Sequence, residues 1–327
     1  MISNTYQVWS DEEYNYPLAF DFVPNFVSYL HDEDERIRPA IVIAPGGGYC
    51  LVSPAEGEIV ALEFYHKGYN VFVHTYTTNI LMAEPLKLQP LKDLSRTVRM
   101  LRKNADSLRI DPNQIAICGF SAAGHLCCSL AVHYEDIGED NEVYSEFSNR
   151  PDAVILSYPV ITSGEKAHRG SFLALLGADA TEEELNYMSL EKQVKKTTPP
   201  IFVWQTVTDE AVPVENSYLI AQACHQMGVA YEHHVFAEGV HGLSLANEAW
   251  ATGRFDGFYT MQQTMNIIKK AKAGELEVSQ ELMQMLTAME VAEKEEDRSS
   301  VVERKPDEAV AMWPILADYW LKRVLGR

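Results

Sequence analysis

The sequence predicts an α/β fold with a mostly parallel, doubly wound sheet and helices on both of its faces. Two observations lead to this prediction. Short apolar, β-branched segments that are typical of buried strands alternate with segments of helical period. Glycine-rich turns follow two of these strands, at residues 45–49 and 119–124. Strands that alternate with helices are joined by crossover connections, so the sheet is expected to be parallel.

The elements are expected in the following order. Residues 1–38 are polar and aromatic, and two short apolar runs at 19–23 and 25–30 are predicted to be antiparallel edge strands. The first half then alternates as strand 39–44, helix 53–67, strand 69–76, helix 90–104, strand 115–118 and helix 122–132. The second half supplies strand 153–158, strand 200–206, helix 216–227, strand 229–236 and a closing helix at 309–325.

Two segments interrupt this alternation within a single domain that spans residues 1–327. Residues 162–198 are polar and locally helical, with a capping box at Thr181 and Glu184, and are expected to form a small cap above the carboxyl edge of the sheet. Residues 253–308 form a helical insertion whose segment 279–296 carries a methionine-rich apolar face. This insertion is either a helical pair packed on its own domain, or a lid or homodimerisation element.

Composition excludes several classes of protein. The 327 residues carry a formal net charge of −20, and such a surface repels nucleic acid and anionic membranes, so neither is expected as a partner. No apolar run approaches the ~20 residues that cross a membrane, and the first residues do not resemble a signal peptide. The five cysteines lie mostly in apolar contexts, which favours reduced thiols and a cytoplasmic location. No motif for a metal or another cofactor is found, so none is expected.

Ser121 lies in the turn GFSAAG at residues 119–124, between a predicted strand and a predicted helix. A nucleophile elbow requires this context, because the sharp turn brings the residues two before and two after the serine against neighbouring backbone. Gly119 and Ala123 are small enough for these positions. The alternative is a glycine-rich turn with an incidental serine.

The other glycine-rich turn, PGGGY at residues 45–49, also follows a predicted buried strand. Consecutive glycines expose backbone N–H groups above the sheet, and such groups stabilise a developing oxyanion. Neither the P-loop pattern nor the dinucleotide-binding pattern is completed here. A flexible turn is the alternative.

An acid and a histidine follow two later strands. Asp209 comes after strand 200–206 and His241 after strand 229–236, so both are expected at the edge of the sheet that holds Ser121. A serine needs an imidazole base, and the base needs a carboxylate that orients it. The order Ser121, Asp209, His241 is the one found in α/β-hydrolases. Glu210 is an alternative acid, and a role in capping its loop is the alternative for His241.

Four motifs in this order resemble the bacterial acetylesterases of the α/β-hydrolase fold, which include acetylxylan-esterase-like and hormone-sensitive-lipase-like enzymes. They are PGGGY, GFSAAGHL, TPPIFVWQTVTDEAVPVENS and GVHGLSLA, and the resemblance covers roughly residues 35–250 and the final helix. It implies Ser121 as the nucleophile, Asp209 and His241 as its partners, and an oxyanion hole made by the amides of Gly47, Gly48 and Ala122. Two positions depart from the pattern. Pro45 replaces a histidine that is frequent in the lipase-like branch, which favours the acetylxylan-esterase-like branch, and Ala123 replaces the second glycine of the elbow.

The expected activity is therefore hydrolysis of short-chain acyl esters, principally acetyl esters and among them acetylated sugars, through a Ser-His-Asp triad and an acyl-enzyme. Tyr49, beside the glycines, is expected to contact a small-molecule ester substrate. Two other classes stay open. An acylaminoacyl or prolyl-type peptidase usually has a large extra domain before the hydrolase domain, and a non-catalytic hydrolase-fold binding protein often lacks one triad member.

Overall fold

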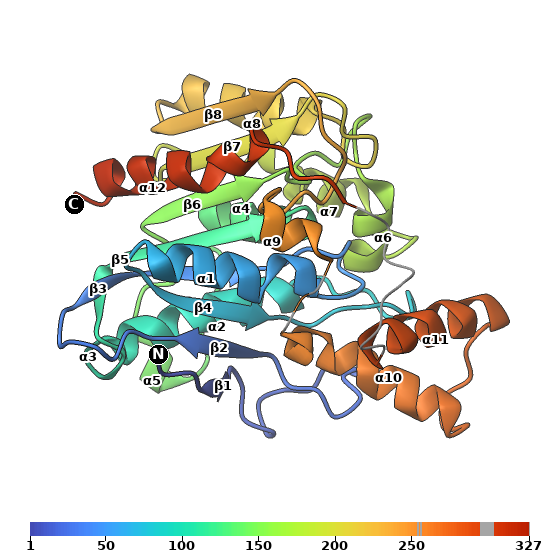
Figure 1. The fold of residues 1–327 in the computed structure, drawn as a ribbon. Helices are drawn as coiled ribbons and strands as arrows, with labels where there is room; N and C mark the ends of the chain where they lie inside the picture. Colours follow the sequence, from blue (N-terminus) through green and yellow to red (C-terminus); the bar gives the residue numbers. More distant parts are fainter. Residues whose placement is uncertain (254, 256, 295–303, 327) are drawn as a thin grey trace.

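The computed structural model describes residues 1–253, 255, 257–294 and 304–326. The described residues form an eight-stranded sheet with the strand order β1-β2-β4-β3-β5-β6-β7-β8 (Figure 1). The pairs β1–β2 and β2–β4 are antiparallel, whereas all the later pairs in this order are parallel. The strands are β1 (Thr5–Gln7), β2 (Asn25–Tyr29), β3 (Arg38–Ala44), β4 (Asn70–Thr75), β5 (Ile110–Phe120), β6 (Ala153–Ser157), β7 (Ile201–Thr206) and β8 (Tyr231–Phe236).

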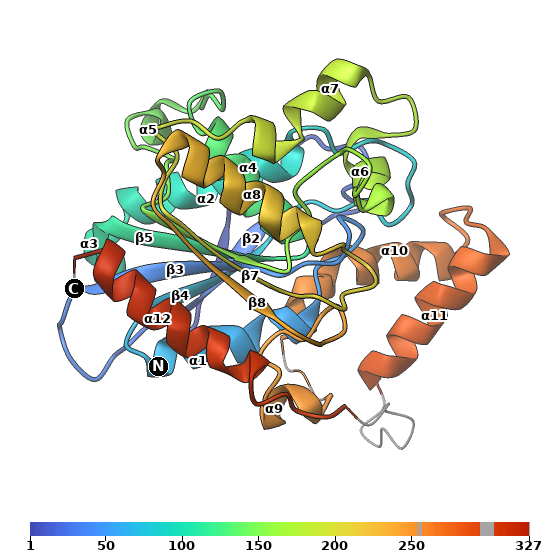
Figure 2. The ribbon, with the colours of Figure 1, turned by 90° about the horizontal axis from the view of Figure 1, so that it is seen from above.

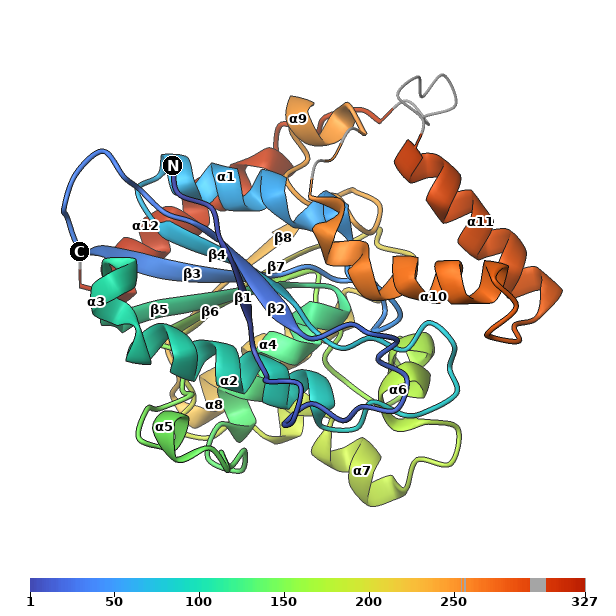
Figure 3. The same ribbon diagram turned by 90° about the horizontal axis from the view of Figure 1, so that it is seen from below.

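Helices cover both faces of the sheet, as Figures 2 and 3 show. One face is covered by α2, α4 and α8, and the other by α1 and α12. The α-helices are α1 (Glu58–His66), α2 (Gln89–Lys103), α3 (Ala105–Leu108), α4 (Ala122–His133), α5 (Glu142–Ser145), α6 (Arg169–Leu176), α7 (Glu182–Tyr187), α8 (Glu215–Met227), α9 (Glu248–Ala251), α10 (Gln262–Lys272), α11 (Gln280–Lys294) and α12 (Trp313–Val324). Short 3-10 helices are η1 (Pro54–Glu56), η2 (Leu190–Lys192), η3 (Phe258–Met261) and η4 (Val310–Met312).

The central strands are rich in apolar residues and buried along their whole length because both of their faces are covered. Every residue of β3, β4, β6 and β7 is buried. On the side of α12 the core contains stacked indoles, since the rings of Trp204 and Trp313 lie 5.4 Å apart between their centroids, and Phe120 meets Trp313 edge to face. The predicted doubly wound, mostly parallel sheet is therefore confirmed.

The predicted strand at residues 19–23 is wrong. Phe20 and Asp21 have φ angles of 50° and 63°, which extended backbone does not adopt, and the segment forms turns. The side chain of Phe20 instead packs against the helical insertion. The carbonyl of Phe20 accepts a hydrogen bond from Asn266 of α10. The edge strand is instead β1, whereas the predicted antiparallel strand at 25–30 is present as β2.

Residues 162–198 contain α6, α7 and η2 and lie at the carboxyl ends of the parallel strands (Figure 1). The predicted capping box is present, with Thr181 and Glu184 bonded reciprocally at the start of α7. Within the described part of the chain, no helix combines the length and the apolar character needed to cross a membrane.

The helical insertion at residues 253–308 contributes η3, α10 and α11, and α9 lies just before it. Helix α10 is bonded to the body of the domain, because Gln263 accepts hydrogen bonds from the amide and the hydroxyl of Thr78. Ile267, Ile268 and Leu286 form a small apolar cluster with Ile80, and Cys50, which directly follows the PGGGY turn, packs against it. Part of the predicted helix 279–296 is observed as α11, while residues 295 and 296 lie outside the described residues.

Candidate active site

Ser121 lies between β5 and α4, in a backbone conformation with φ 52° and ψ −118°. A non-glycine residue rarely adopts a positive φ, and such strain persists only where the surroundings impose it. The neighbouring chain explains why the flanking residues are small. A Cβ atom on Gly119 would lie 2.1 Å from the carbonyl oxygen of Ala123, and one on Gly124 would lie 2.7 Å from Cβ of Pro159. The turn therefore has the sharpness that the GFSAAG motif predicts.

The structure brings Ser121, His241 and Asp209 into one hydrogen-bonded chain. His241 Nε2 lies 2.8 Å from Ser121 Oγ, and His241 Nδ1 lies 2.7 Å from Asp209 Oδ2. A carboxylate only accepts hydrogen bonds, so Nδ1 donates to Asp209 and Nε2 is left to accept the serine proton. This arrangement can turn the serine hydroxyl into a nucleophile.

The carboxylate of Asp209 is fixed in place by its own loop. Its side chain is fully buried, and its Oδ1 accepts hydrogen bonds from the amides of Ala211 and Val212 at 3.0 and 2.9 Å. Oδ2 accepts from the imidazole of His241 at 2.7 Å and, at the longer distance of 3.4 Å, from Nε2 of Gln205. Glu210, the alternative acid, is exposed and has no hydrogen bond to His241 among the described residues. His241 itself is partly open to solvent, with 22% of its side chain exposed.

The glycine turn lies directly against the elbow, because a Cβ atom on Gly46 would lie 3.0 Å from Cβ of Ser121. Most polar groups of this turn are bonded. The carbonyl of Pro45 accepts a hydrogen bond from the hydroxyl of Tyr76, and the carbonyl of Gly46 accepts one from the amide of Ser53. The carbonyl of Gly47 accepts from the amides of Cys50 and Leu51. Within the described residues, no acceptor is bonded to the amides of Gly47, Gly48 and Ala122. These are the donors that the sequence predicts for an oxyanion hole, and the amide of Ala122 also lies at the positive N-terminal end of α4.

Tyr49 is placed differently from what the sequence suggests. Its side chain is 1% exposed, and its hydroxyl donates a hydrogen bond to Nδ1 of His125 at 2.9 Å. The other ring nitrogen of His125 donates to the carbonyl of Met188, and burial lowers the pKa of His125 to about 4, so the ring is neutral. This position does not support the predicted contact of Tyr49 with substrate. Tyr49 instead joins the glycine turn to helix α4.

Sequence reasoning missed Glu56 and Tyr158. The sequence predicts one helix over residues 53–67, but this segment is divided into η1 and α1, and Glu56 at the end of η1 is only 5% exposed. Its carboxylate accepts hydrogen bonds from the amide of Gly46 and the hydroxyl of Tyr158. The ring of Tyr158 contacts that of His241 edge to face, with centroids 5.0 Å apart. The only signal in the sequence is an acidic residue shortly after the glycine turn.

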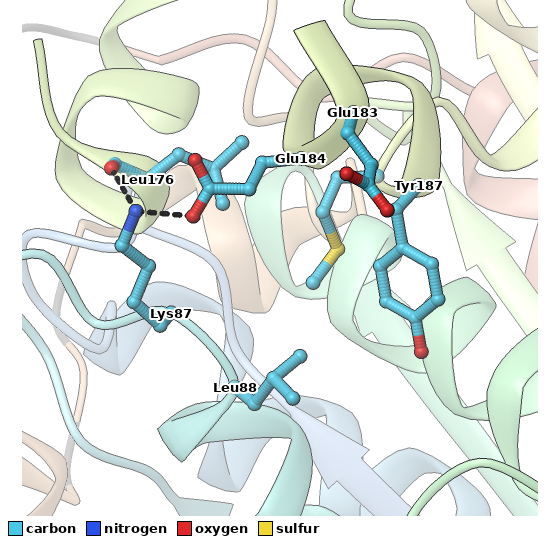
Figure 4. A pocket seen from close by; sticks show the side chains of 7 residues that line it. Lys87, Leu88, Leu176, Glu183, Glu184 and Tyr187 are labelled. Carbon is cyan, nitrogen blue, oxygen red and sulfur yellow. Dashed lines mark hydrogen bonds and ion pairs between the residues drawn. The ribbon is translucent and has the colours of Figure 1, made fainter. Parts of the chain in front are cut away.

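The cap segment reaches the surroundings of the triad through His168, which precedes α6. His168 is half-buried, and burial and the nearby His241 lower its pKa. A cavity of about 480 Å³ lies further along the cap, between α7 and the start of α2 (Figure 4). Lys87 and Glu184 form an ion pair at its wall, and the triad does not line it. Its lining residues are Lys87, Leu88, Leu176, Glu183, Glu184, Tyr187 and Met188.

The strand order, the elbow and the Ser121–His241–Asp209 geometry define an α/β-hydrolase. The model of the BD-FAE family matches residues 28–224, which is more than half of the chain, and the chain belongs to this family. The resemblance to acetylesterases that the four motifs indicate is thus confirmed.

Three similar proteins illustrate this relationship. Endo-1,4-beta-xylanase B of Butyrivibrio fibrisolvens is 51% identical over 258 residues, which are 79% of this chain and 40% of that protein. An acetylxylan esterase of Xylanibacter ruminicola is 27% identical over 249 residues, 74% of this chain and 48% of that one. The chain thus spans less than half the length of these two relatives. The crystal structure of an acetyl ester-xyloside bifunctional hydrolase from Caldicellulosiruptor lactoaceticus has a TM-score of 0.70 and 33% identity, and the match covers 84% of this chain and 97% of that one.

Proposed function

We propose that this protein hydrolyses short acyl esters, principally acetyl groups on xylan-type sugars, with Ser121 as the nucleophile. The observation that carries the proposal is the unbroken chain of hydrogen bonds from Ser121 through His241 to Asp209, beside amides of the glycine turn to which no described residue is bonded as an acceptor. Each of these groups has one role in acyl transfer.

The first half of the reaction forms an acyl-enzyme. Oγ of Ser121 attacks the ester carbonyl carbon while its proton moves to Nε2 of His241, and Asp209 stabilises the resulting imidazolium. The carbonyl oxygen becomes an oxyanion, which accepts hydrogen bonds from the amides of Gly47, Gly48 and Ala122. The tetrahedral intermediate then collapses. The bond between the carbonyl carbon and the alcohol oxygen breaks, and His241 gives its proton to the departing alkoxide, which leaves as the alcohol.

The second half repeats these steps with water. Nε2 of His241 takes a proton from the water as its oxygen attacks the acyl carbonyl, and the same amides receive the second oxyanion. Collapse of this intermediate releases the carboxylic acid and returns the proton to Ser121. Each oxyanion donor of this kind contributes about 10²-fold or more to the rate.

Two observations support a neutral, acetylated sugar as the substrate class. The relatives and the structural neighbour bear names that refer to xylan, acetylxylan and acetyl ester-xyloside hydrolysis. The formal net charge of −20 disfavours anionic polymers as substrates and does not oppose an uncharged carbohydrate.

Labelling and turnover together test this function. A fluorophosphonate probe is expected to modify wild-type protein at Ser121, and neither Ser121→Ala nor His241→Ala should be labelled at a comparable rate. The wild type should release acetate from acetylated xylo-oligosaccharides and nitrophenyl acetate, and it should act poorly on nitrophenyl esters of long acyl chains. Release of an acylamino acid from an acylated peptide, with no acetate release, would indicate a peptidase. Absence of both labelling and turnover would indicate a binding protein.

Homodimerisation through residues 253–308 stays a prediction. The contacts of α10 with Thr78 and Ile80 support packing of the insertion on its own domain. Removal of residues 275–305 addresses both ideas. A decrease in oligomer size would support an interface, and a changed preference for acyl length would support a lid.

A further inference from the structure

We infer that Glu56 is a positioning residue that joins the glycine turn of the oxyanion hole to the histidine of the triad, through the amide of Gly46 and the side chain of Tyr158. The inference rests on the proposed esterase function. It concerns a buried carboxylate that takes no part in the triad itself.

The first contact fixes the glycine turn. Oε2 of Glu56 accepts a hydrogen bond from the amide of Gly46 at 2.7 Å. Gly46 is closely surrounded, since a Cβ atom there would lie 2.5 Å from the carbonyl oxygen of Phe120 and 3.1 Å from Oε2 of Glu56. The Gly46 amide is bonded to Glu56, whereas among the described residues no acceptor is bonded to the amides of Gly47, Gly48 and Tyr49. Glu56 therefore sets which amides of the turn are left for an oxyanion.

The second contact reaches the histidine. Oε1 of Glu56 accepts a hydrogen bond from the hydroxyl of Tyr158 at 2.6 Å, and the tyrosine ring lies edge to face with His241. The backbone of Tyr158 has a φ of 38°, so its position is imposed by its surroundings. The ring is enclosed by Phe120 and Trp204, at centroid distances of 5.7 and 5.1 Å. Movement of the Tyr158 hydroxyl would thus be transmitted to the imidazole.

A third set of contacts ties the loop after His241 to the same place. The amide of Ser244 donates to the hydroxyl of Tyr158 at 3.1 Å, and the hydroxyl of Ser244 donates to the carbonyl of Ala55 at 2.7 Å. Ala55 directly precedes Glu56 in η1. The loop that carries the base is therefore bonded at Ser244 both to η1 and to the tyrosine that Glu56 holds.

The donors around Glu56 fit an ionised carboxylate. The amide of Gly46 can only donate, and the hydroxyl oxygen of Tyr158 already accepts from Ser244, so its proton is directed to Glu56. Burial raises the pKa of Glu56, while the hydrogen bonds from Tyr158 and Gly46 and the nearby His241 oppose this rise. A negative charge near the imidazole favours the imidazolium that forms during acyl transfer. Glu56 would thus assist the same step that Asp209 assists.

The variant Glu56→Gln tests the inference, because an amide has the shape of the carboxylate but offers only one acceptor atom to two donors. One donor is left unpaired in a buried place. We expect kcat for nitrophenyl acetate to fall about 10- to 100-fold with KM changed less than about threefold, since the lost alignment matters most in the transition state. The rate of fluorophosphonate labelling should fall in parallel. Tyr158→Phe removes one of the two hydrogen bonds that Glu56 accepts, so it should lower kcat less than Glu56→Gln does. The fall in kcat of the double variant should be smaller than the product of the falls in the two single variants.

Asp93→Asn provides a matched control. Asp93 is another fully buried carboxylate, on α2, and it accepts hydrogen bonds from Thr77, Trp9 and Gln89. Its change to an amide is of the same kind and lies outside the site, so it should reduce thermal stability and leave kcat per labelled active site unchanged. Rates are therefore expressed per active site titrated by the phosphonate.

The outcomes separate the inference from the function on which it rests. Wild-type protein that neither labels nor turns over esters overturns both. Wild-type protein that is active, with Glu56→Gln and Tyr158→Phe equal to it in kcat per active site, overturns the inference alone. If Glu56→Gln does not fold, Tyr158→Phe decides. A fall in kcat at constant KM supports the inference, and an unchanged kcat overturns it.

Discussion

The hydroxyl of Tyr49 donates a hydrogen bond to Nδ1 of His125 at 2.9 Å, which connects the glycine turn to the helix that begins next to Ser121. Both side chains are almost completely buried. His125 in turn donates to the carbonyl of Met188, which belongs to the cap segment. One buried histidine therefore joins three parts of the chain that surround the nucleophile.

Tyr49→Phe is expected to lower stability while leaving substrate binding intact. The change removes the donor to His125, so the free energy of unfolding should fall by about 1–3 kcal/mol, as measured by urea denaturation. KM for nitrophenyl acetate should stay within about twofold of the wild type, because the phenol lies in the interior. A large rise in KM at unchanged stability would instead support the direct contact of Tyr49 with substrate that the sequence predicts.

Asp209→Asn is expected to abolish most activity without loss of the fold. The side-chain amide of the variant cannot accept hydrogen bonds from both loop amides and from the imidazole, and it favours the wrong tautomer of His241. We therefore expect kcat to fall about 10⁴-fold. Glu210→Gln is the matched control. Glu210 is adjacent to Asp209 but exposed, so the kcat of the Glu210→Gln variant should equal that of the wild type. Comparable losses in both variants would contradict the assignment of Asp209 as the acid.

Much of this architecture could be predicted from the sequence because its determinants are local. The apolar runs that become β3, β5 and β7 predict buried strands, and the GFSAAG turn is a local steric requirement that any α/β-hydrolase elbow must meet. The order of Ser121, Asp209 and His241 follows from the strands that they succeed. Their convergence to hydrogen-bonding distance is then a consequence of the parallel sheet.

What could not be predicted depends on contacts between distant segments. Strand β1 is short and mostly exposed, and only its pairing with β2 defines it. The apolar run at 19–23 resembles a strand, but Phe20 packs against the apolar cluster of the insertion and its carbonyl accepts a hydrogen bond from Asn266 of α10, which lies more than 200 residues later. Likewise, the burial of Glu56 depends on Tyr158 and Gly46. Nothing near residue 56 distinguishes such a carboxylate from an ordinary acid in the first turn of a helix.

Gly119→Ala is expected to damage the elbow even though the added group is a single methyl. Its Cβ would lie 2.1 Å from the carbonyl oxygen of Ala123 and 2.7 Å from Sγ of Cys127, and the closer atom belongs to the backbone, so it cannot move aside as the end of a flexible side chain could. The free energy of unfolding should fall by about 1–3 kcal/mol or more. The rate of phosphonate labelling at Ser121 should also fall. Gly138→Ala is the control, because no atom lies within 4 Å of its added Cβ, and stability should change by less than about 0.5 kcal/mol.

Stability is expected to depend on pH through His74, a fully buried residue of β4 whose Nδ1 lies 3.2 Å from the hydroxyl of Thr97 in α2. Burial lowers its pKa to about 3, and no described group is bonded to its Nε2. In the unfolded chain a histidine has a pKa of about 6.5. Between these two values the unfolded state binds one more proton than the native state, so the free energy of unfolding falls as the pH falls.

A variant without this histidine isolates the effect. From pH 7 to pH 5, wild-type protein should lose about 2 kcal/mol more stability than His74→Leu, in urea denaturation at both pH values. His66→Gln, which removes an exposed histidine, should follow the wild type. Other titrating groups are shared by all three proteins and cancel in the comparison. Parallel losses in wild type and His74→Leu would mean that His74 takes up its proton in the folded protein, which its burial against Tyr76 and Thr97 opposes.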